Sequence, residues 1–139
     1  MKTTTWFDLK NTPEGVDLGV TLSGTGAATA KLLPNGLIIV DSDTAEAAKT
    51  ITLTTPYAMK VLDAMVINGA ATAVTVTLKN NATALTDAMT PAAGADTIIA
   101  RATTLDDAQD DFAVDDDDLV LAVGVAALTG RVIIKIQFT

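Results

Sequence analysis

Apolar and polar side chains alternate with a period of two near the end of the chain, and this pattern constrains the fold most. In residues 131–139, Val132, Ile134, Ile136 and Phe138 share one face of an extended chain, and Ile133, Lys135 and Gln137 share the other. Such alternation is typical of a β-strand with one buried face. It recurs in 49–54, with Ile51 and Leu53 inward, and in 72–79, with Val74, Val76 and Leu78 inward. The chain is therefore predicted to form β-sheet.

Three further segments are strand candidates with less regular patterns. Residues 118–123 and 97–102 are apolar on both faces, as expected for strands inside a sandwich. Residues 57–67 also fit a helical stripe, but their run of Met, Val and Ile ends at an Asn-Gly turn signal, so a strand is predicted there. The only helix signal is Ser-Asp-Thr at 42–44, which is suited to cap a single turn over 45–48.

Turn signals separate these segments at short intervals. They are Pro34-Asn35-Gly36, Asn68-Gly69, Asn80-Asn81 and Thr129-Gly130, the last of which is predicted to lie between the final two strands. The Pro-Asn-Gly signal predicts a hairpin turn. Short strands with closely spaced turns predict an all-β, antiparallel β-sandwich or barrel.

Residues 1–48 differ from the rest in composition, since they contain five of the nine glycines and both serines. Their strand candidates are 3–9, 16–22 and 37–40, interrupted by turns that contain Gly and Pro. Two interpretations stay open. These residues are either an N-terminal arm on a β-sandwich body formed by 49–139, or the first strands of the same domain. The length of 139 residues suits one structural domain overall.

Missing residue types narrow the chemistry. The chain has no Cys and no His, which excludes disulfides, metal sites of the thiolate or imidazole type and catalytic triads with His. The net charge is −8, with only nine scattered Lys and Arg, which argues against nucleic acid and membrane surfaces as partners. No apolar run suits a signal peptide or a membrane span of roughly 20 residues. We expect a soluble protein made in a cytoplasm and kept or assembled there.

The net charge is a local feature. Eight of the 17 acidic residues lie between Asp106 and Asp118, a window without Lys or Arg, whereas nine acids and nine bases cancel outside it. Converging carboxylates are able to hold Ca²⁺, but the window lacks the spacing and the Gly of an EF-hand loop. The preferred interpretation is a solvated loop whose repulsion prevents wrong strand pairing. Whether the Asp106–Asp118 window binds a cation stays open.

Two other features suggest chemistry only superficially. The segment 24–29, Gly-Thr-Gly-Ala-Ala-Thr, mimics a dinucleotide-binding turn. The helix after it would be cut short at Pro34 and no further βαβ units follow, so a flexible turn is predicted. Trp6 and Tyr57 are too isolated to line a sugar-binding cleft, and Trp6 is predicted to anchor an arm or a subunit contact. We predict that the chain is not an enzyme, with no catalytic, cofactor-binding or metal-ligating residue and no cofactor.

The C-terminal two-thirds of the chain resembles a known family. Its order is AMKVLDAMVING (58–69), TAVTVTLKNN (72–81), TALTDAM (83–89), GADTIIARATTLDDAQDDFAVDDDDLVLAV (94–123) and GRVIIKIQF (130–138). This resembles the small β-sandwich decoration, or cement, proteins of tailed bacteriophages, in which an acidic connection beginning TLDDA leads to an apolar strand before the last one. The resemblance covers about 80 residues and rests on pattern.

The resemblance implies a jelly-roll-like fold, a homotrimer and a place on the capsid exterior, with the major capsid protein as partner and no active site. Such a protein would be synthesised in the host cytoplasm and would clamp neighbouring capsomers. The mean hydropathy of +0.38 and an Ala and Thr content of one third independently favour burial against other chains. The alternatives are a tail or fibre component and a non-catalytic carbohydrate-binding or adhesin-type β-sandwich module.

Overall fold

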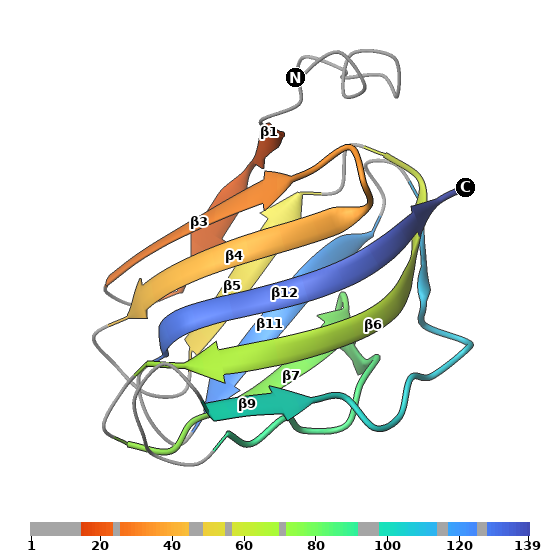
Figure 1. Cartoon of the computed structure of the whole chain (residues 1–139). Coiled ribbons are helices and arrows are strands. Elements are labelled where there is room, and N and C mark those ends of the chain that lie inside the picture. The colour runs from red at the N-terminus through yellow and green to blue at the C-terminus, as the bar shows by residue number, and fades with distance from the viewer. Residues whose placement is uncertain are drawn as a thin grey trace.

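The computed structural model describes residues 15–23, 26–44, 49–54, 57–69, 72–91, 98–113, 117–124 and 128–139. In these ranges the regular secondary structure consists of β-strands, with no helix. The strands form two antiparallel sheets stacked as a β-sandwich (Figure 1). The predicted all-β, antiparallel sandwich is confirmed.

Strands that follow one another along the chain often belong to different sheets. Over the described ranges, sheet A contains β1 (Val16–Leu18), β3 (Gly26–Leu32), β4 (Leu37–Thr44), β6 (Met59–Asn68), β9 (Ile98–Arg101), β10 (Asp111–Phe112) and β12 (Thr129–Phe138). Sheet B contains β2 (Val20–Leu22), β5 (Lys49–Thr54), β7 (Thr75–Asn80), β8 (Thr83–Ala84) and β11 (Asp118–Gly124). Sheet A has the order β1-β3-β4-β12-β6-β10, with β9 also paired to β6, and sheet B has the order β2-β5-β11-β7-β8.

The hydrophobic core lies between the sheets and consists of the inward residues that the alternation selects. In β12 these are Val132, Ile134 and Ile136, and in β5 they are Ile51 and Leu53, all of them buried. Burying a side chain of this size contributes about 1.5–3 kcal/mol relative to leaving it exposed. Strand β11 supplies further core residues at alternate positions, so the central strands of both sheets face each other across the core.

The ambiguous segment 57–67 forms a strand, as predicted. In β6, Val61 and Ala64 are both buried. They are three residues apart, whereas residues on the same face of a regular strand are an even number apart. The pairing register with β12 shifts at this point, which marks a β-bulge, and Leu62 is left 39% exposed. The extra residue breaks the period of two, so the buried positions of β6 do not follow a strict alternation.

The prediction of one strand over 16–22 is wrong. The chain leaves sheet A after β1 and enters sheet B with β2, and Gly19 is the residue between them. The carbonyl of Gly19 accepts a hydrogen bond from the N–H of Thr54 at 3.0 Å. A Cβ atom at position 19 would lie 2.9 Å from the Thr54 hydroxyl oxygen. The glycine therefore allows the crossing strand to approach β5 closely.

Two further local predictions are corrected. The helix cap at 42–44 is wrong, because these residues continue β4 and the Ser42 hydroxyl donates to the carbonyl of Leu128 at 3.1 Å; residues 45–48 lie outside the described ranges. The turn at Thr129-Gly130 is also wrong, because both residues belong to β12. A side chain at position 130 would collide with the carbonyl of Ile67, so this glycine allows β12 to lie close to β6.

Two of the other turn signals agree with the structure, whereas Asn68 is the last residue of β6 and residues 70–71 lie outside the described ranges. Gly36, with φ at +86°, closes the hairpin between β3 and β4, and Asn81, with φ at +53°, lies in the turn between β7 and β8. The expected short strand over 83–89 is reduced to β8, followed by two isolated bridges, which join Thr86 to Leu105 and Met89 to Val76. Residues 16–44 supply β1 to β4, which pair within both sheets, whereas residues 1–14 lie outside the described ranges.

Candidate functional site

The outer face of sheet A is the surface best suited to bind a partner. Its strands present an apolar band that runs diagonally across the sheet, formed by Leu37, Ile39, Ile133, Met65, Ile67 and Ile99. Ile99 is 56% exposed, although it is a large apolar residue. We call the band and the charged residues around it (Lys31, Asp41, Asp63, Arg101, Arg131 and Lys135) the sheet A face. A contiguous apolar patch with a polar rim is typical of a macromolecular contact.

The same alternation that builds the core places these residues outside. Ile133 lies between Val132 and Ile134, which point into the core, and it is opposite both Ile39 and Met65 in the neighbouring strands. Apolar residues at outward positions gain nothing from the core of their own chain. They are therefore available for contact with another surface.

Two ion pairs fix the charged side chains on either side of the band. The Arg131 guanidinium donates from Nε to Asp41 Oδ1 at 2.7 Å, and Arg101 Nε donates to Asp63 Oδ2 at 2.9 Å. The Arg101 hydrogen bond, opposed by partial burial, lowers the pKa of Asp63, and the Ala64 N–H and the charge of Lys135 add to this effect. Exposed pairs of this kind contribute only about 0–1 kcal/mol to stability, so their main effect is to orient the arginines.

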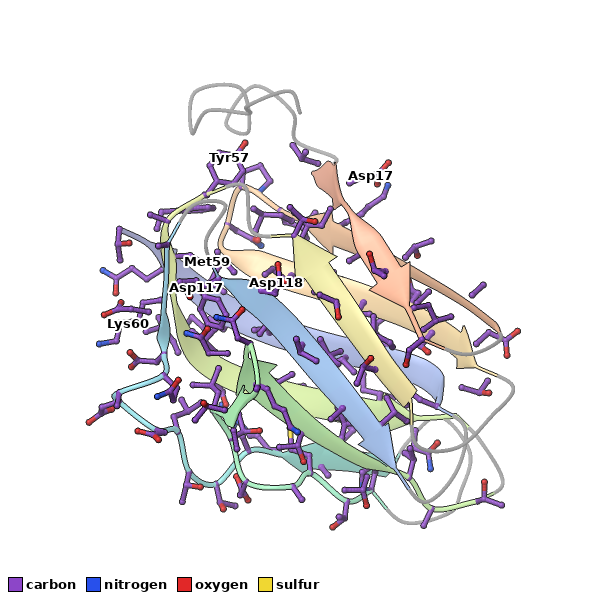
Figure 2. All side chains as sticks on the ribbon, turned by 180° about the vertical axis from the view of Figure 1, so that it is seen from behind. Asp17, Tyr57, Met59, Lys60, Asp117 and Asp118 are labelled. Atoms are coloured by element: carbon purple, nitrogen blue, oxygen red, sulfur yellow. The ribbon has the colours of Figure 1, made fainter. Side chains whose placement is uncertain are left out.

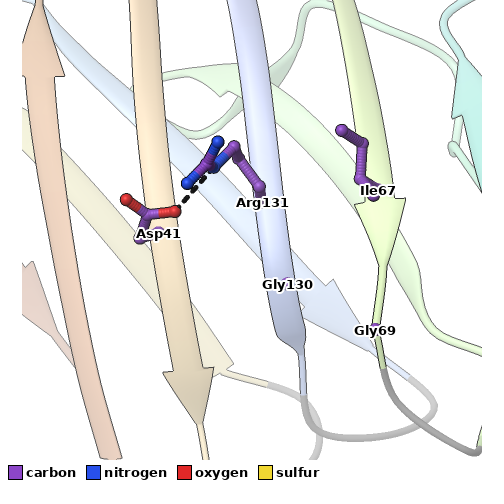
Figure 3. Close-up of a pocket in the computed structure, with 5 residues that line it drawn as sticks. All are labelled: Asp41, Ile67, Gly69, Gly130 and Arg131. Carbon is purple, nitrogen blue, oxygen red and sulfur yellow. Dashed lines mark hydrogen bonds and ion pairs between the residues drawn. The ribbon is translucent and has the colours of Figure 1, made fainter. Parts of the chain in front are cut away.

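Shallow hollows surround the pair formed by Asp41 and Arg131. One, with a volume of about 310 Å³, is lined by these two residues with Ile67, Gly69 and Gly130 (Figure 3). A second hollow of about 310 Å³ lies over β3 and β4, and a third of about 260 Å³ lies beside Lys31. They are depressions in a sheet surface, which suit protruding side chains of a partner better than an enclosed small ligand.

The acidic window lies at the end of the sandwich where β6 begins and β12 ends. Strand β10 inside the window pairs with the first residues of β6, and Figure 2 shows Lys60, Asp117 and Asp118 in this region. Asp110 is buried, and its Oδ2 atom lies 3.4 Å from the Lys60 ammonium nitrogen. Its Oδ1 atom is buried without a hydrogen-bond partner.

Other members of the window also have structural roles. The side chain of Asp117 accepts hydrogen bonds from Asn81 Nδ2 at 3.1 Å and from the Ala113 N–H at 2.9 Å. Asp106 accepts the N–H of Ala108, and the Asn80 amide donates to the carbonyls on either side of Asp110. The expectation of a solvated loop holds for Asp106, Asp107, Asp111 and Asp118, which are exposed, but not for the buried Asp110. Two of its carboxylates hold the loop to the sandwich, while Asp107 and Asp111 are exposed.

A further structural carboxylate escaped the sequence analysis. Asp87 accepts hydrogen bonds from the N–H groups of Thr103 and Thr104 and from the Thr103 hydroxyl at 2.7 Å. These hydrogen bonds lower the pKa of Asp87 from 3.8 to about 2. The contact joins segments 16 residues apart in sequence, and no local pattern marks it.

The remaining sequence features are placed as follows. Within the described ranges, no three carboxylates or other metal-binding side chains converge on one point. Residues 24 and 25 lie outside the described ranges, and the rest of the glycine-rich segment belongs to β3, so no helix N-terminus follows it. Trp6 also lies outside them, and Tyr57 is buried against Phe138 in an edge-on contact with ring centroids 5.7 Å apart.

Comparison with known proteins gives no family for the chain. No protein-family model, no curated protein and no solved structure matches it. Among the described residues there is also no helix with the length and apolar character needed to cross a membrane.

Proposed function

We propose that this chain is a structural protein of a bacteriophage virion that binds the outside of the capsid and stabilises it by clamping neighbouring capsomers. The order of the strands carries this proposal. The order β4-β12-β6-β9 in sheet A and β5-β11-β7-β8 in sheet B agrees with that of an eight-stranded jelly roll. Jelly rolls recur in viral capsid domains and in lectins.

The surface of the molecule supports a role in assembly. The sheet A face offers an apolar band and shallow hollows, which suit contact with another protein. An assembly of several copies needs only modest affinity at each site, because linked sites raise the effective concentration of one another. In this proposal the partners are the major capsid protein and further copies of the chain, and the location is the capsid exterior.

A carbohydrate-binding module, the alternative function for a β-sandwich, is disfavoured by the placement of the described aromatic side chains. Sugar-binding faces commonly use exposed aromatic rings. Here Tyr57 and Phe112 are 6% and 2% exposed, and the partly buried Phe138 packs against Tyr57. No described aromatic ring is therefore free to stack on a sugar.

The test uses capsids of the phage whose genome carries this sequence, purified after deletion of the gene. Purified protein is mixed with these capsids and with isolated tails in separate samples, and each mixture is pelleted through a sucrose cushion. We expect saturable co-sedimentation with capsids and a higher temperature of capsid disruption, measured by light scattering. Binding to tails instead of capsids, or no binding to either, would contradict the proposal.

A further inference from the structure

All the sulfur of this chain is in methionine. The sequence contains four methionines and no Cys, so a sulfur of this protein is oxidised only as a thioether. Met59, Met65 and Met89 lie in the described ranges. Oxidants attack sulfur according to its exposure, so the packing of these three residues decides which of them reacts.

Met59 and Met89 are members of the hydrophobic core. They are 2% and 0% exposed. A small oxidant reaches side chains in a core only when the surrounding strands open, and such openings have a high free-energy cost. The folded protein therefore protects both thioethers.

Met65 has the opposite orientation. It lies in β6 between Ala64 and Val66, which are both buried in the core, so its own side chain is on the outer side of sheet A and is only partly buried. It is paired with Ile133 of β12 on one side and with Arg101 of β9 on the other. Of the three described methionines, Met65 alone is accessible from solvent.

Met65 is also part of the surface proposed to contact a partner. One row of paired residues crosses sheet A in the order Asp17, Lys31, Ile39, Ile133, Met65 and Arg101. Charged residues form the ends of this row, and its middle consists of the three apolar residues. A partner that covers the apolar middle of the row covers the thioether of Met65 as well.

We propose that Met65 is a site of reversible oxidation, and that its sulfoxide weakens the contact between the sheet A face and the capsid. In the reaction the sulfur forms a bond to one oxygen atom of a peroxide, the O–O bond breaks, and hydrogen peroxide is reduced to water. Methionine sulfoxide reductases reverse the change. The assignment of Met65 as the reactive site rests on the fold alone, whereas its effect on binding rests on the proposed function.

The effect on binding follows from the polarity of the product. Oxidation turns a flexible apolar side chain into a polar one. Side chains directly opposite each other on adjacent strands have Cβ atoms about 4.5–5.5 Å apart, so the sulfoxide of Met65 lies beside Ile133. A partner that packs on these apolar residues then buries the sulfoxide oxygen among groups that donate no hydrogen bond, which costs free energy. The unmodified thioether has no such cost and adapts its shape to the partner.

The experiment combines peptide mapping with the capsid sedimentation described above. Wild type, Met65→Leu and Met65→Gln are treated with hydrogen peroxide at neutral pH or left untreated, and mass spectrometry locates each added oxygen atom. Met65→Leu keeps an apolar side chain without sulfur, and Met65→Gln keeps a similar length but is polar. Both changes are on the outer side of the sheet, and circular dichroism checks that the variants are folded.

We expect Met65 of the wild type to gain one oxygen atom at least about tenfold faster than Met59 and Met89, which react only through opening of the core. The oxidised wild type and untreated Met65→Gln should bind capsids at least about tenfold more weakly than the untreated wild type, because each buries an unpaired polar group. Met65→Leu should bind like the wild type before and after peroxide treatment. A sulfoxide reductase should restore the binding of the oxidised wild type.

Equal oxidation rates at the three methionines, or no oxidation at Met65, would overturn the assignment of the site. Full capsid binding by protein oxidised at Met65 would overturn the effect on binding and leave the proposed function standing. The same conclusion would follow if peroxide weakened the binding of Met65→Leu as much as that of the wild type. If the untreated wild type binds no capsid, the proposed function and the effect on binding fail together, and peptide mapping still decides whether Met65 is the reactive site.

Discussion

The ion pair between Lys60 and Asp110 gives a sharp test of how the acidic window is held. Asp110 has a side chain that is 5% exposed, whereas that of Lys60 is 42% exposed. Replacing Lys60 by Met keeps an unbranched side chain of similar length but leaves a carboxylate buried without a cation. Replacing Asp110 by Asn keeps the shape of the buried group, removes its charge and lets the Lys60 ammonium turn toward water.

These two changes are therefore unequal. Removing one partner of a fully buried ion pair costs about 3–5 kcal/mol. Because the ammonium is partly in water, the cost of Lys60→Met is reduced, and we expect about 2 kcal/mol. The neutral amide of Asp110→Asn avoids the penalty of an unpaired charge, so we expect a cost below about 1 kcal/mol. In the double variant the buried charge is gone, and its stability should resemble that of Asp110→Asn alone.

Urea unfolding at pH 7, followed by circular dichroism at one fixed protein concentration, measures these differences. With a slope of about 2 kcal/mol per molar urea, Lys60→Met should lower the midpoint by about 1 M. A fixed concentration is needed because self-association adds to apparent stability. The reasoning fails if Lys60→Met is as stable as the wild type, or if Asp110→Asn costs more than Lys60→Met.

Two further predictions concern a close strand contact and a low pKa. Gly130→Ala should lower the free energy of unfolding by about 1–3 kcal/mol, because its new methyl group collides with the Ile67 carbonyl. The control Gly124→Ala has no atom within 4 Å of the new methyl group, so it should melt like the wild type. Equal losses of melting temperature in the two variants would contradict the steric argument. The lowered pKa of Asp87 means that its hydrogen bonds stabilise the fold fully above its ordinary pKa of 3.8 and stop doing so as the pH falls through about 2. Asp87→Asn should thus be less stable than the wild type at pH 6, and the difference should shrink to a small fraction of this at pH 2, where about half of Asp87 is protonated. A difference at pH 2 as large as at pH 6 would refute this.

The strands were predictable because burial imposes a period of two on any segment with one face in the core. Strand β5 has the bounds that its alternation predicted, and β12 buries the expected Val132, Ile134 and Ile136. The failures lie at glycines whose role depends on a distant neighbour. Gly19 allows a crossing beside Thr54, and Gly130 allows close contact with β6. Neither neighbour is near in sequence, so Gly19 was predicted to lie inside one continuous strand and Gly130 in a turn.

Apolar residues at outward strand positions are the sequence signal for the sheet A face. Ile133 lies on the polar side of an alternating strand, and an apolar residue at such a position points away from the core between the sheets. The same holds for Ile39, which lies beside it across the strands. What the sequence does not contain is the strand order, which brings residues about 90 positions apart next to each other. The buried position of Asp110 depends in the same way on β10 pairing with β6.

Salt should separate the stability of one copy from the stability of the assembly. The fold depends mainly on apolar burial between the sheets, and exposed pairs such as Arg131 with Asp41 add about 0–1 kcal/mol each. A contact between copies that depends on the exposed charges of the acidic window or of the sheet A face is instead screened by salt. Raising the salt concentration should therefore dissociate the copies well before it unfolds them. If unfolding and dissociation occurred together, the sheet A face would be part of the folding core of the oligomer, and the description of one self-sufficient sandwich would fail.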